Sequence, residues 1–233
     1  MLPVAILAGG LATRLRPITQ TIPKALVDVA GTPFVLRQLE YLRGQGFQRI
    51  VLCVGHLGEQ IEAIVGDGRA LGLEVSYSYD GPQLLGTGGA LRRALPLLGP
   101  QFVVMYGDSW LPIDFREVVA RFTASGAPAL MVVLHNGHRW DKSNVLYSDG
   151  RIVEYNKRTP RPEMTYIDYG VGVLSASLLS AYADNDVVDL ADIYHALSLR
   201  GELAGCEVTE RFYEIGSHEG LAETIAFFDK EKK

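Results

Sequence analysis

The chain has 233 residues, of which 48% are hydrophobic and 21% are charged, values typical of an ordinary soluble protein with a sizeable core. Its net charge of −5 argues against a surface that binds nucleic acid or an anionic membrane.

The first eight residues are apolar, but they are too few to span a membrane and carry no basic start of a signal peptide. The two cysteines, Cys53 and Cys206, show neither a disulfide framework nor metal-ligand spacing. We therefore expect a cytoplasmic protein without a membrane partner.

Up to His135, short apolar runs alternate with stretches of helical period. This alternation predicts βαβ units, hence an α/β fold with a Rossmann-like, mostly parallel sheet flanked by helices. Ligands of such sheets bind beyond the carboxyl ends of the strands. We expect strands at Val4–Ala8, Arg49–Gly55, Glu74–Tyr79, Phe102–Tyr106 and Ala129–His135, and helices at Phe34–Gly46, Gly58–Val65, Gly89–Leu98 and Asp114–Ala124.

After His135 the pattern favours a more antiparallel second half. A Ser-Asp-Gly turn at residues 148–150 predicts a hairpin, and the basic, proline-rich stretch 157–162 predicts a loop. A strand is expected at Tyr169–Leu174, and helices after the N-cap residue Asp189 and over Gly220–Lys230. With no linker visible, we expect one domain over residues 1–233.

A glycine pair, Gly9 and Gly10, follows the first expected strand, and two arginines and a lysine come soon after it. Adjacent glycines allow backbone N–H groups to approach an anion closely. The segment is neither a lysine-serine phosphate loop nor a G-x-G-x-x-G fingerprint, which disfavours simple ATPases and dehydrogenases.

Residues 9–26 read G-G-x-x-T-R-L-x-P-x-T-x-x-x-P-K-x-L, which resembles the signature of sugar-1-phosphate nucleotidyltransferases, although Ala12 stands where that family often has glycine. The resemblance implies transfer of a nucleoside monophosphate to a sugar 1-phosphate, with Arg14 neutralising the departing pyrophosphate and Lys24 contacting the α-phosphate. It also implies a nucleotide-binding half at 1–135 and a sugar-phosphate-binding half at 136–233. The nucleotide-binding residues that we carry over are Leu7, Ala8, Gly9, Gly10, Thr13, Gln83, Gly86, Thr87 and Gly88.

Two carboxylates are candidates for a Mg²⁺ site. Asp108 ends an apolar run in a Gly-Asp pair, where the family has a metal-binding Asp. Glu214 lies in Glu-Ile-Gly, where the family usually has Asp-Ile-Gly or Asp-Val-Gly. A surface carboxylate near a helix start is the alternative role for Glu214. Mg²⁺ takes few carboxylates and completes its shell with water and phosphate oxygens.

The sugar-phosphate side departs further from the family pattern. Lys157 would bind the phosphate of the sugar, but Asn156 replaces the usual Glu. Asp168 replaces the Asn of the family's I-N-A-G segment, whose Gly is kept as Gly170 and permits close approach of the backbone. With Asp108, these residues form the expected sugar-phosphate site. The replacements suggest a different sugar or a different hydrogen-bond pattern.

Overall resemblance favours GTP with D-manno-heptose or mannose 1-phosphate. Alternatives are a uridylyltransferase acting on N-acetylmuramic acid or glucose 1-phosphate, a cytidylyltransferase acting on a non-sugar phosphate, and a non-catalytic nucleotide-sugar-binding regulatory subunit. The expected partners are an NTP, a sugar 1-phosphate and a second copy of the chain in a homodimer, with Mg²⁺ as cofactor.

Overall fold

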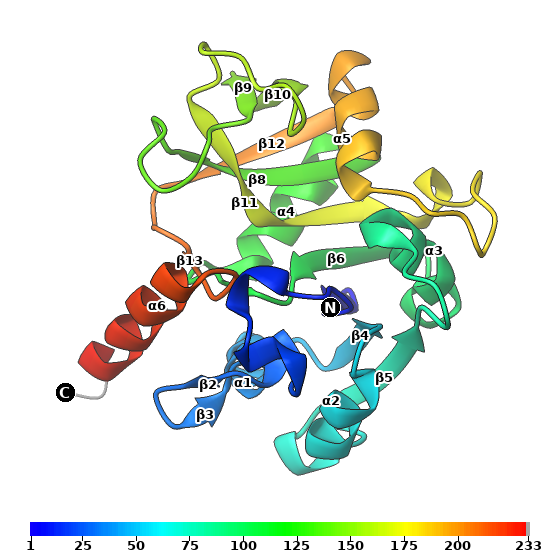
Figure 1. The fold of residues 1–233 in the computed structure, drawn as a ribbon. Helices are drawn as coiled ribbons and strands as arrows, with labels where there is room; N and C mark the ends of the chain where they lie inside the picture. The colour runs from blue at the N-terminus through cyan, green and yellow to red at the C-terminus, as the bar shows by residue number, and fades with distance from the viewer. Residues whose placement is uncertain (232–233) are drawn as a thin grey trace.

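The computed structural model describes residues 1–231, which form one nine-stranded sheet with helices on both faces (Figure 1). Its strands coincide with runs of β-branched and other apolar residues, which fit a pleated surface that is buried on both sides. They are β1 (Val4–Leu7), β4 (Arg49–Val54), β5 (Glu74–Tyr79), β6 (Gln101–Tyr106), β8 (Ala129–His135), β9 (Val145–Ser148), β10 (Arg151–Tyr155), β11 (Tyr166–Ser175) and β12 (Leu203–Val208).

The strand order across the sheet is β5-β4-β1-β6-β11-β8-β12-β10-β9. The first four strands of this order are mutually parallel. Beyond β6 the neighbouring strands are antiparallel, except for the parallel pair β8 and β12. The carboxyl ends of β1, β4 and β6 therefore lie side by side, and the loops that follow them share one edge of the sheet.

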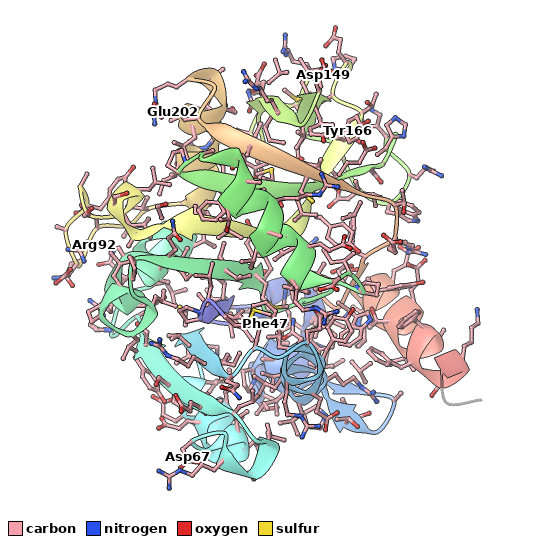
Figure 2. The ribbon with its side chains drawn as sticks, turned by 180° about the vertical axis from the view of Figure 1, so that it is seen from behind. Phe47, Asp67, Arg92, Asp149, Tyr166 and Glu202 are labelled. Atoms are coloured by element: carbon pink, nitrogen blue, oxygen red, sulfur yellow. The ribbon has the colours of Figure 1, made fainter. Side chains whose placement is uncertain are left out.

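The α-helices of the described chain are α1 (Phe34–Gly44), α2 (Gly58–Val65), α3 (Gly86–Leu98), α4 (Phe115–Ser125), α5 (Leu190–Leu199) and α6 (His218–Glu231). Helices α1, α2 and α4 bury their apolar faces against one side of the sheet, and α3 and α5 cover the other side. Figure 2 shows α4 crossing the first of these sides, with Phe47 in the interior beside it. The rings of Phe47 and Phe115 meet edge to face, with centroids 6.2 Å apart.

Two small antiparallel pairs lie beside the main sheet. One joins β2 (Asp28–Val29) to β3 (Thr32–Pro33), and the other joins β7 (Ser109–Trp110) to β13 (Tyr213–Glu214). The second pair ties the chain just after β6 to the chain just before α6, since Glu214 pairs with Ser109 and the amide N of Ile215 donates to the carbonyl of Asp108 at 2.9 Å. Helix α6 then extends away from the sheet (Figure 1).

The expected α/β class and the more antiparallel second half are confirmed, with small shifts of the element ends. Helix α3 begins at Gly86, three residues before the expected start, and α1 ends at Gly44. Strand β12 was not anticipated, because Leu203–Val208 contains a glycine and only a weak alternation. Within residues 1–231, no helix combines the length and apolar character that crossing a bilayer would need.

Candidate active site

The glycine-rich loop after β1 is held in an unusual backbone shape. Ala12 adopts a left-handed conformation, with φ 48° and ψ 43°, directly before the short 3-10 helix Thr13–Leu15. The buried Thr19 donates a hydrogen bond of 2.7 Å from its hydroxyl to the carbonyl of Ala12. Glycine adopts such angles without steric cost, which explains why glycine is the residue expected at position 12.

Glycines allow the ends of the parallel strands to approach one another closely. A Cβ on Gly9 would lie 3.1 Å from the amide N of Gly55, and a Cβ on Gly107 would lie 2.8 Å from the carbonyl of Leu7. No heavy atom lies within 4 Å of the position for a Cβ on Gly10, so open space adjoins that residue. The loop after β1 therefore packs on its neighbours at Gly9 and opens outward at Gly10.

A first cavity of about 220 Å³ opens at this edge of the sheet. It brings together residues from the loop after β1, the segment before α3 and the carboxyl end of β6. It includes most residues carried over for nucleotide binding, together with Lys24 and Asp108. The lining is Leu7, Ala8, Gly9, Gly10, Lys24, Ala25, Cys53, Asp80, Leu84, Gly86, Thr87, Ala90, Tyr106, Gly107 and Asp108.

Three residues expected at the nucleotide, Thr13, Gln83 and Gly88, do not line this cavity. Thr13 and Gln83 are exposed. Gly88 instead packs against the chain before α5: its amide donates to the carbonyl of Val188 at 2.8 Å, and an added Cβ would lie 2.9 Å from a methyl carbon of Val188. The second glycine cluster thus has a packing role at Gly88.

Asp80 was not anticipated and lines the first cavity. It is only 6% exposed, and burial raises the pKa of its carboxyl group, an effect opposed by a hydrogen bond from the amide of Leu85 and by the charge of Arg93. The carboxylate oxygen Oδ2 lies 3.5 Å from the position for a Cβ on Gly9. A buried acid at a cavity wall is a candidate ligand-contacting group.

A second cavity, of about 550 Å³, adjoins the first, and Tyr106 and Asp108 line both. Its walls come from the loop after β8, from β10, from β11 and from the chain around β13. The lining is Arg14, Tyr106, Asp108, Ser109, Arg139, Trp140, Asp141, Lys142, Asn144, Tyr155, Lys157, Pro160, Ile167, Asp168, Arg211, Phe212, Tyr213, Glu214, Ser217, Glu219, Gly220 and Glu223.

Charged groups gather where the two cavities meet. Lys24 Nζ donates a hydrogen bond of 2.8 Å to Oδ2 of Asp108. Three charged groups surround the point that a Cβ on Gly216 would occupy. Their nearest atoms are Glu214 Oε2 at 2.5 Å, Arg14 Nη2 at 3.1 Å and Asp108 Oδ2 at 3.4 Å. A glycine at this position therefore leaves room in which two carboxylates and a guanidinium converge.

The carboxylate of Glu214 is turned toward the start of α6. It accepts hydrogen bonds from the amide of Gly216 and from the hydroxyl of Ser217, the latter at 2.6 Å. A Cβ on Gly220 would lie 2.5 Å from the carboxyl carbon of Glu214. A negative charge at a helix start is favourable in its own right, so the alternative role foreseen for Glu214 is present here.

The donor set at the junction fits Mg²⁺. The oxygens Asp108 Oδ2 and Glu214 Oε2 converge beside Gly216, and Mg²⁺ favours a few hard carboxylate oxygens with its other positions left to water or phosphate. Within the described chain there is no cluster of three or more His, Cys, Asp or Glu side chains that would suggest a closed metal cage. An open two-carboxylate site suits a metal that also contacts a phosphate.

Asp168 lies between the second cavity and the core. Its Oδ1 accepts a hydrogen bond of 2.9 Å from the amide of Gly170, which has φ 95°. Burial raises the pKa of the Asp168 carboxyl to about 6, opposed by that hydrogen bond and by the charge of Lys157. Lys157 lines the same cavity, so two expected sugar-phosphate residues come together.

Asn156 has a different placement from the one expected. Its side-chain oxygen accepts from the amide of Thr159 at 2.9 Å, which closes a turn, and it does not line the second cavity. Two other lining residues, Arg139 and Trp140, carried no motif and were not anticipated. Only the folded loop after β8 brings them to the site.

Comparisons with known proteins agree with this geometry. A family model described as nucleotidyl transferase matches residues 4–144, more than half of the chain. The chain is 34% identical, over 91% of its length and 92% of the relative's, to an N-acetylmuramate alpha-1-phosphate uridylyltransferase of Neisseria meningitidis. It is 25% identical, over 91% and 93%, to a D-glycero-alpha-D-manno-heptose 1-phosphate guanylyltransferase of Campylobacter jejuni.

Among solved structures, HddC from Yersinia pseudotuberculosis, complexed with GMP-PN, superposes with a TM-score of 0.80 at 26% identity. The match covers 98% of this chain and 100% of that one. The sheet, its flanking helices and the segment around β13 therefore belong to a shared architecture.

Proposed function

This chain belongs to the nucleotidyl transferase family, and we propose that it joins a nucleoside monophosphate to a sugar 1-phosphate with release of pyrophosphate. Its relatives are sugar-1-phosphate nucleotidyltransferases, and it is an enzyme of that type. The observation that carries the proposal is that two adjoining cavities share Asp108, with Lys24 paired to it. Two substrates whose phosphates must meet require such a junction.

The first cavity would hold the nucleoside triphosphate. Its glycine-rich rim, Gly9 and Gly10, offers backbone N–H groups for the phosphates. At the junction, Lys24 would contact the α-phosphate as a point charge. Arg14, beside Gly216, would neutralise charge on phosphate oxygens.

The second cavity would hold the sugar 1-phosphate, with its phosphate at the shared end and Lys157 as a cationic contact. An oxygen of the sugar phosphate attacks the α-phosphorus, and the bond from the α-phosphorus to the oxygen that bridges it to the β-phosphorus breaks. The leaving group departs as pyrophosphate. Because the attacking oxygen is already deprotonated near neutral pH, the reaction needs positioning and charge neutralisation rather than a general base.

Asp108 and Glu214 would hold Mg²⁺ beside Gly216. When bound there, the ion would neutralise charge on phosphate oxygens. Lys24, now paired with Asp108, would then be released toward a phosphate.

For the substrates, we rank uridylyl transfer to N-acetylmuramic acid 1-phosphate first. The supporting observation is the 34% identity to an uridylyltransferase for that sugar over 92% of its length. Guanylyl transfer to a manno-heptose 1-phosphate, favoured from the sequence, is the second candidate, because HddC matches along nearly the whole chain and was solved with GMP-PN. The cytoplasmic location and the homodimer stay predictions.

The test is to measure pyrophosphate release for each of the four NTPs against mannose, manno-heptose, glucose, N-acetylglucosamine and N-acetylmuramic acid 1-phosphates, with Mg²⁺ or EDTA. We expect turnover that EDTA abolishes, with the highest kcat/KM for UTP and N-acetylmuramic acid 1-phosphate. A preference for GTP with manno-heptose 1-phosphate would select the second candidate. Absence of turnover with every pair would refute the proposed reaction.

A further inference from the structure

The loop at residues 136–143, which follows β8, is organised around a buried polar residue. Asn136 is fully buried; its side-chain amide donates to the carbonyl of Asp141 at 2.6 Å and to the hydroxyl of Ser143 at 3.1 Å, and its side-chain oxygen accepts from the amide of Trp140 at 3.2 Å. Such internal hydrogen bonds hold a loop in one shape. The loop is thus a preformed part of the second cavity.

The side chains at the tip of this loop form one wall of the second cavity. Trp140 is 38% exposed there, with the guanidinium of Arg139 5.0 Å from its ring centroid. Across from it, Arg211 lies 5.2 Å from the same ring, and the ring of Phe212 lies 6.4 Å from it. We call Arg139, Trp140, Lys142, Arg211 and Phe212 the Trp140 wall.

Two chain segments far apart in the sequence build this wall. In Figure 1, the loop after β8 and the segment between β12 and β13 both lie at the left, beyond the ends of these strands. The guanidinium groups of Arg139 and Arg211 both lie over the Trp140 ring, so a sugar ring would meet the exposed part of the indole beside two cations.

The cations of the Trp140 wall have donors to spare. The ion pairs found among the described residues involve neither Arg139 nor Lys142. Arg139 donates from Nε to the carbonyl of Asn136 at 3.1 Å and from Nη2 to the carbonyl of His135 at 3.3 Å, and these neutral acceptors leave its charge without a carboxylate partner. Arg211 pairs with Glu223 through one terminal nitrogen, while its Nε is buried without a hydrogen-bond partner. Buried polar groups are normally paired, so an unpaired guanidinium N–H in a cavity wall points to an acceptor supplied by a ligand.

The acidic side chains in the same part of the cavity accept a hydrogen bond, form an ion pair or lie at the start of a helix. Asp141 accepts a hydrogen bond of 2.6 Å from the amide of Lys142, and Glu223 pairs with Arg211. Glu219 lies in the first turn of α6, where a negative charge is favourable. Arg139 and Lys142 therefore keep their charges available to a ligand.

The position of the Trp140 wall in the second cavity determines which part of a bound substrate contacts it. The end of the second cavity at Asp108 is shared with the first cavity, whereas the Trp140 wall lines the second cavity alone. A sugar phosphate at the shared end leaves the rest of its sugar ring and substituents to face the Trp140 wall.

We propose that the Trp140 wall is a subsite for a carboxylate carried by the sugar, so that the acceptor is an acidic sugar 1-phosphate. The sugar packs against the exposed part of Trp140, and the carboxylate accepts charge-assisted hydrogen bonds from Arg139, Lys142 and Arg211 Nε. This inference rests on the proposed nucleotidyl transfer and adds the class of the acceptor and the residues that select it.

The first test compares acceptors that differ by one acidic group. N-acetylmuramic acid 1-phosphate differs from N-acetylglucosamine 1-phosphate by a lactyl ether, and glucuronic acid 1-phosphate differs from glucose 1-phosphate by a carboxylate at C6. We expect kcat/KM about ten- to a hundredfold higher for the acidic member of at least one pair. Glucose 1,6-bisphosphate is included because a second phosphate is the other anionic source.

Arg139→Ala with Lys142→Ala should remove this preference, because kcat/KM for the acidic member should fall about ten- to a hundredfold further than kcat/KM for the neutral member. Arg69→Ala, at a side chain that is 89% exposed and lines neither cavity, is the matched control and should behave as the unmodified protein. Three results would each overturn the carboxylate subsite. They are equal kcat/KM for the two members of both pairs, an equal loss of kcat/KM for both members in the double variant, and the highest kcat/KM with the bisphosphate. In each case turnover itself would leave the proposed reaction standing.

A second readout does not depend on turnover. Of the two tryptophans, Trp140 is exposed in the cavity and Trp110 is buried. Free N-acetylmuramic acid should change the tryptophan fluorescence at lower concentration than free N-acetylglucosamine does, and the change should vanish in Trp140→Phe. The same response to both sugars would contradict a carboxylate contact at this wall, whatever the enzyme's activity.

Discussion

Lys24 Nζ hydrogen-bonds at 2.8 Å to Oδ2 of Asp108, which joins the loop after β1 to the carboxyl end of β6. The side chains are 18% and 31% exposed, so the pair is open to solvent and to a ligand. A lysine held in this way is close to the junction of the two cavities before any substrate arrives, and positioning of that kind lowers the barrier of a transfer between two bound phosphates.

Replacing Lys24 by alanine should lower kcat/KM for nucleotidyl transfer by about a hundred- to a thousandfold, because a preorganised charge near the reacting phosphorus is lost. Thermal unfolding should change less than the rate does, because the pair keeps some contact with solvent and pairs of that kind contribute on the order of 1 kcal/mol. Steady-state rates of pyrophosphate release check the first expectation, with Arg69→Ala as the control. Undiminished kcat/KM in Lys24→Ala would remove this residue from the reaction.

Glu214 has two roles that one pair of variants can separate. Glu214→Gln keeps one oxygen that can accept from the amide of Gly216, and its NH2 group can donate to the hydroxyl of Ser217, so α6 should remain in place, but the charge is lost. We expect the Mg²⁺ concentration for half-maximal rate to rise about tenfold or more, while the Tm shifts by less than that of Glu214→Ala, which also loses the acceptor. If Glu214→Gln shows the same Mg²⁺ dependence as the unmodified enzyme, Glu214 acts on α6 alone.

The raised pKa of Asp168 predicts a pH-dependent stability. The carboxyl is protonated more readily in the folded protein, at about 6, than in the unfolded chain, so its favourable contribution is complete below about pH 4 and is lost as the pH rises through 6. Asp168→Asn removes this loss and keeps the acceptor for Gly170. The free energy of unfolding of Asp168→Asn minus that of the unmodified protein should therefore be about 1–3 kcal/mol larger at pH 8 than at pH 4. Chemical denaturation at both pH values measures it, and a pH-independent difference would show that burial does not govern this carboxyl.

Ala12 offers a test of the loop geometry. Because Ala12 has φ 48°, Ala12→Gly should relieve strain and raise the free energy of unfolding by about 0.5–1 kcal/mol. Ala63→Gly, at an exposed position inside α2, is the matched control and should lower it by about 1 kcal/mol. Destabilisation of the same size by both substitutions would argue against a left-handed backbone at residue 12.

The parts of the site that could be read from the sequence are those in which neighbouring residues define the chemistry. Gly9 and Gly10 lie in the loop just after β1, and Asp108 lies in the turn just after β6, so the topology alone brings them to one edge of the sheet. Glu214 reaches the same place because its own strand, β13, pairs with β7. No local pattern around Glu214 predicts that pairing, and only the family resemblance pointed to it.

The residues that the sequence did not reveal depend on contacts between distant segments. Asp80 becomes a cavity residue only when β5 pairs with β4, whose other neighbour in the sheet is β1. Trp140 meets Arg211 only in the folded chain, and Gly88 is explained by Val188, a hundred residues away. Local patterns cannot show such pairs, because their side chains follow no shared period.

In the proposed reaction, the two cavities bring a sugar phosphate onto the α-phosphorus of a nucleotide at Asp108. The most direct measurement follows radiolabel in parallel reactions with UTP labelled at the α- or the γ-phosphorus, N-acetylmuramic acid 1-phosphate and Mg²⁺, repeated with GTP and manno-heptose 1-phosphate. We expect the α-label in a nucleotide sugar and the γ-label in pyrophosphate. Release of the γ-label as inorganic phosphate, or its transfer to the sugar, would contradict it.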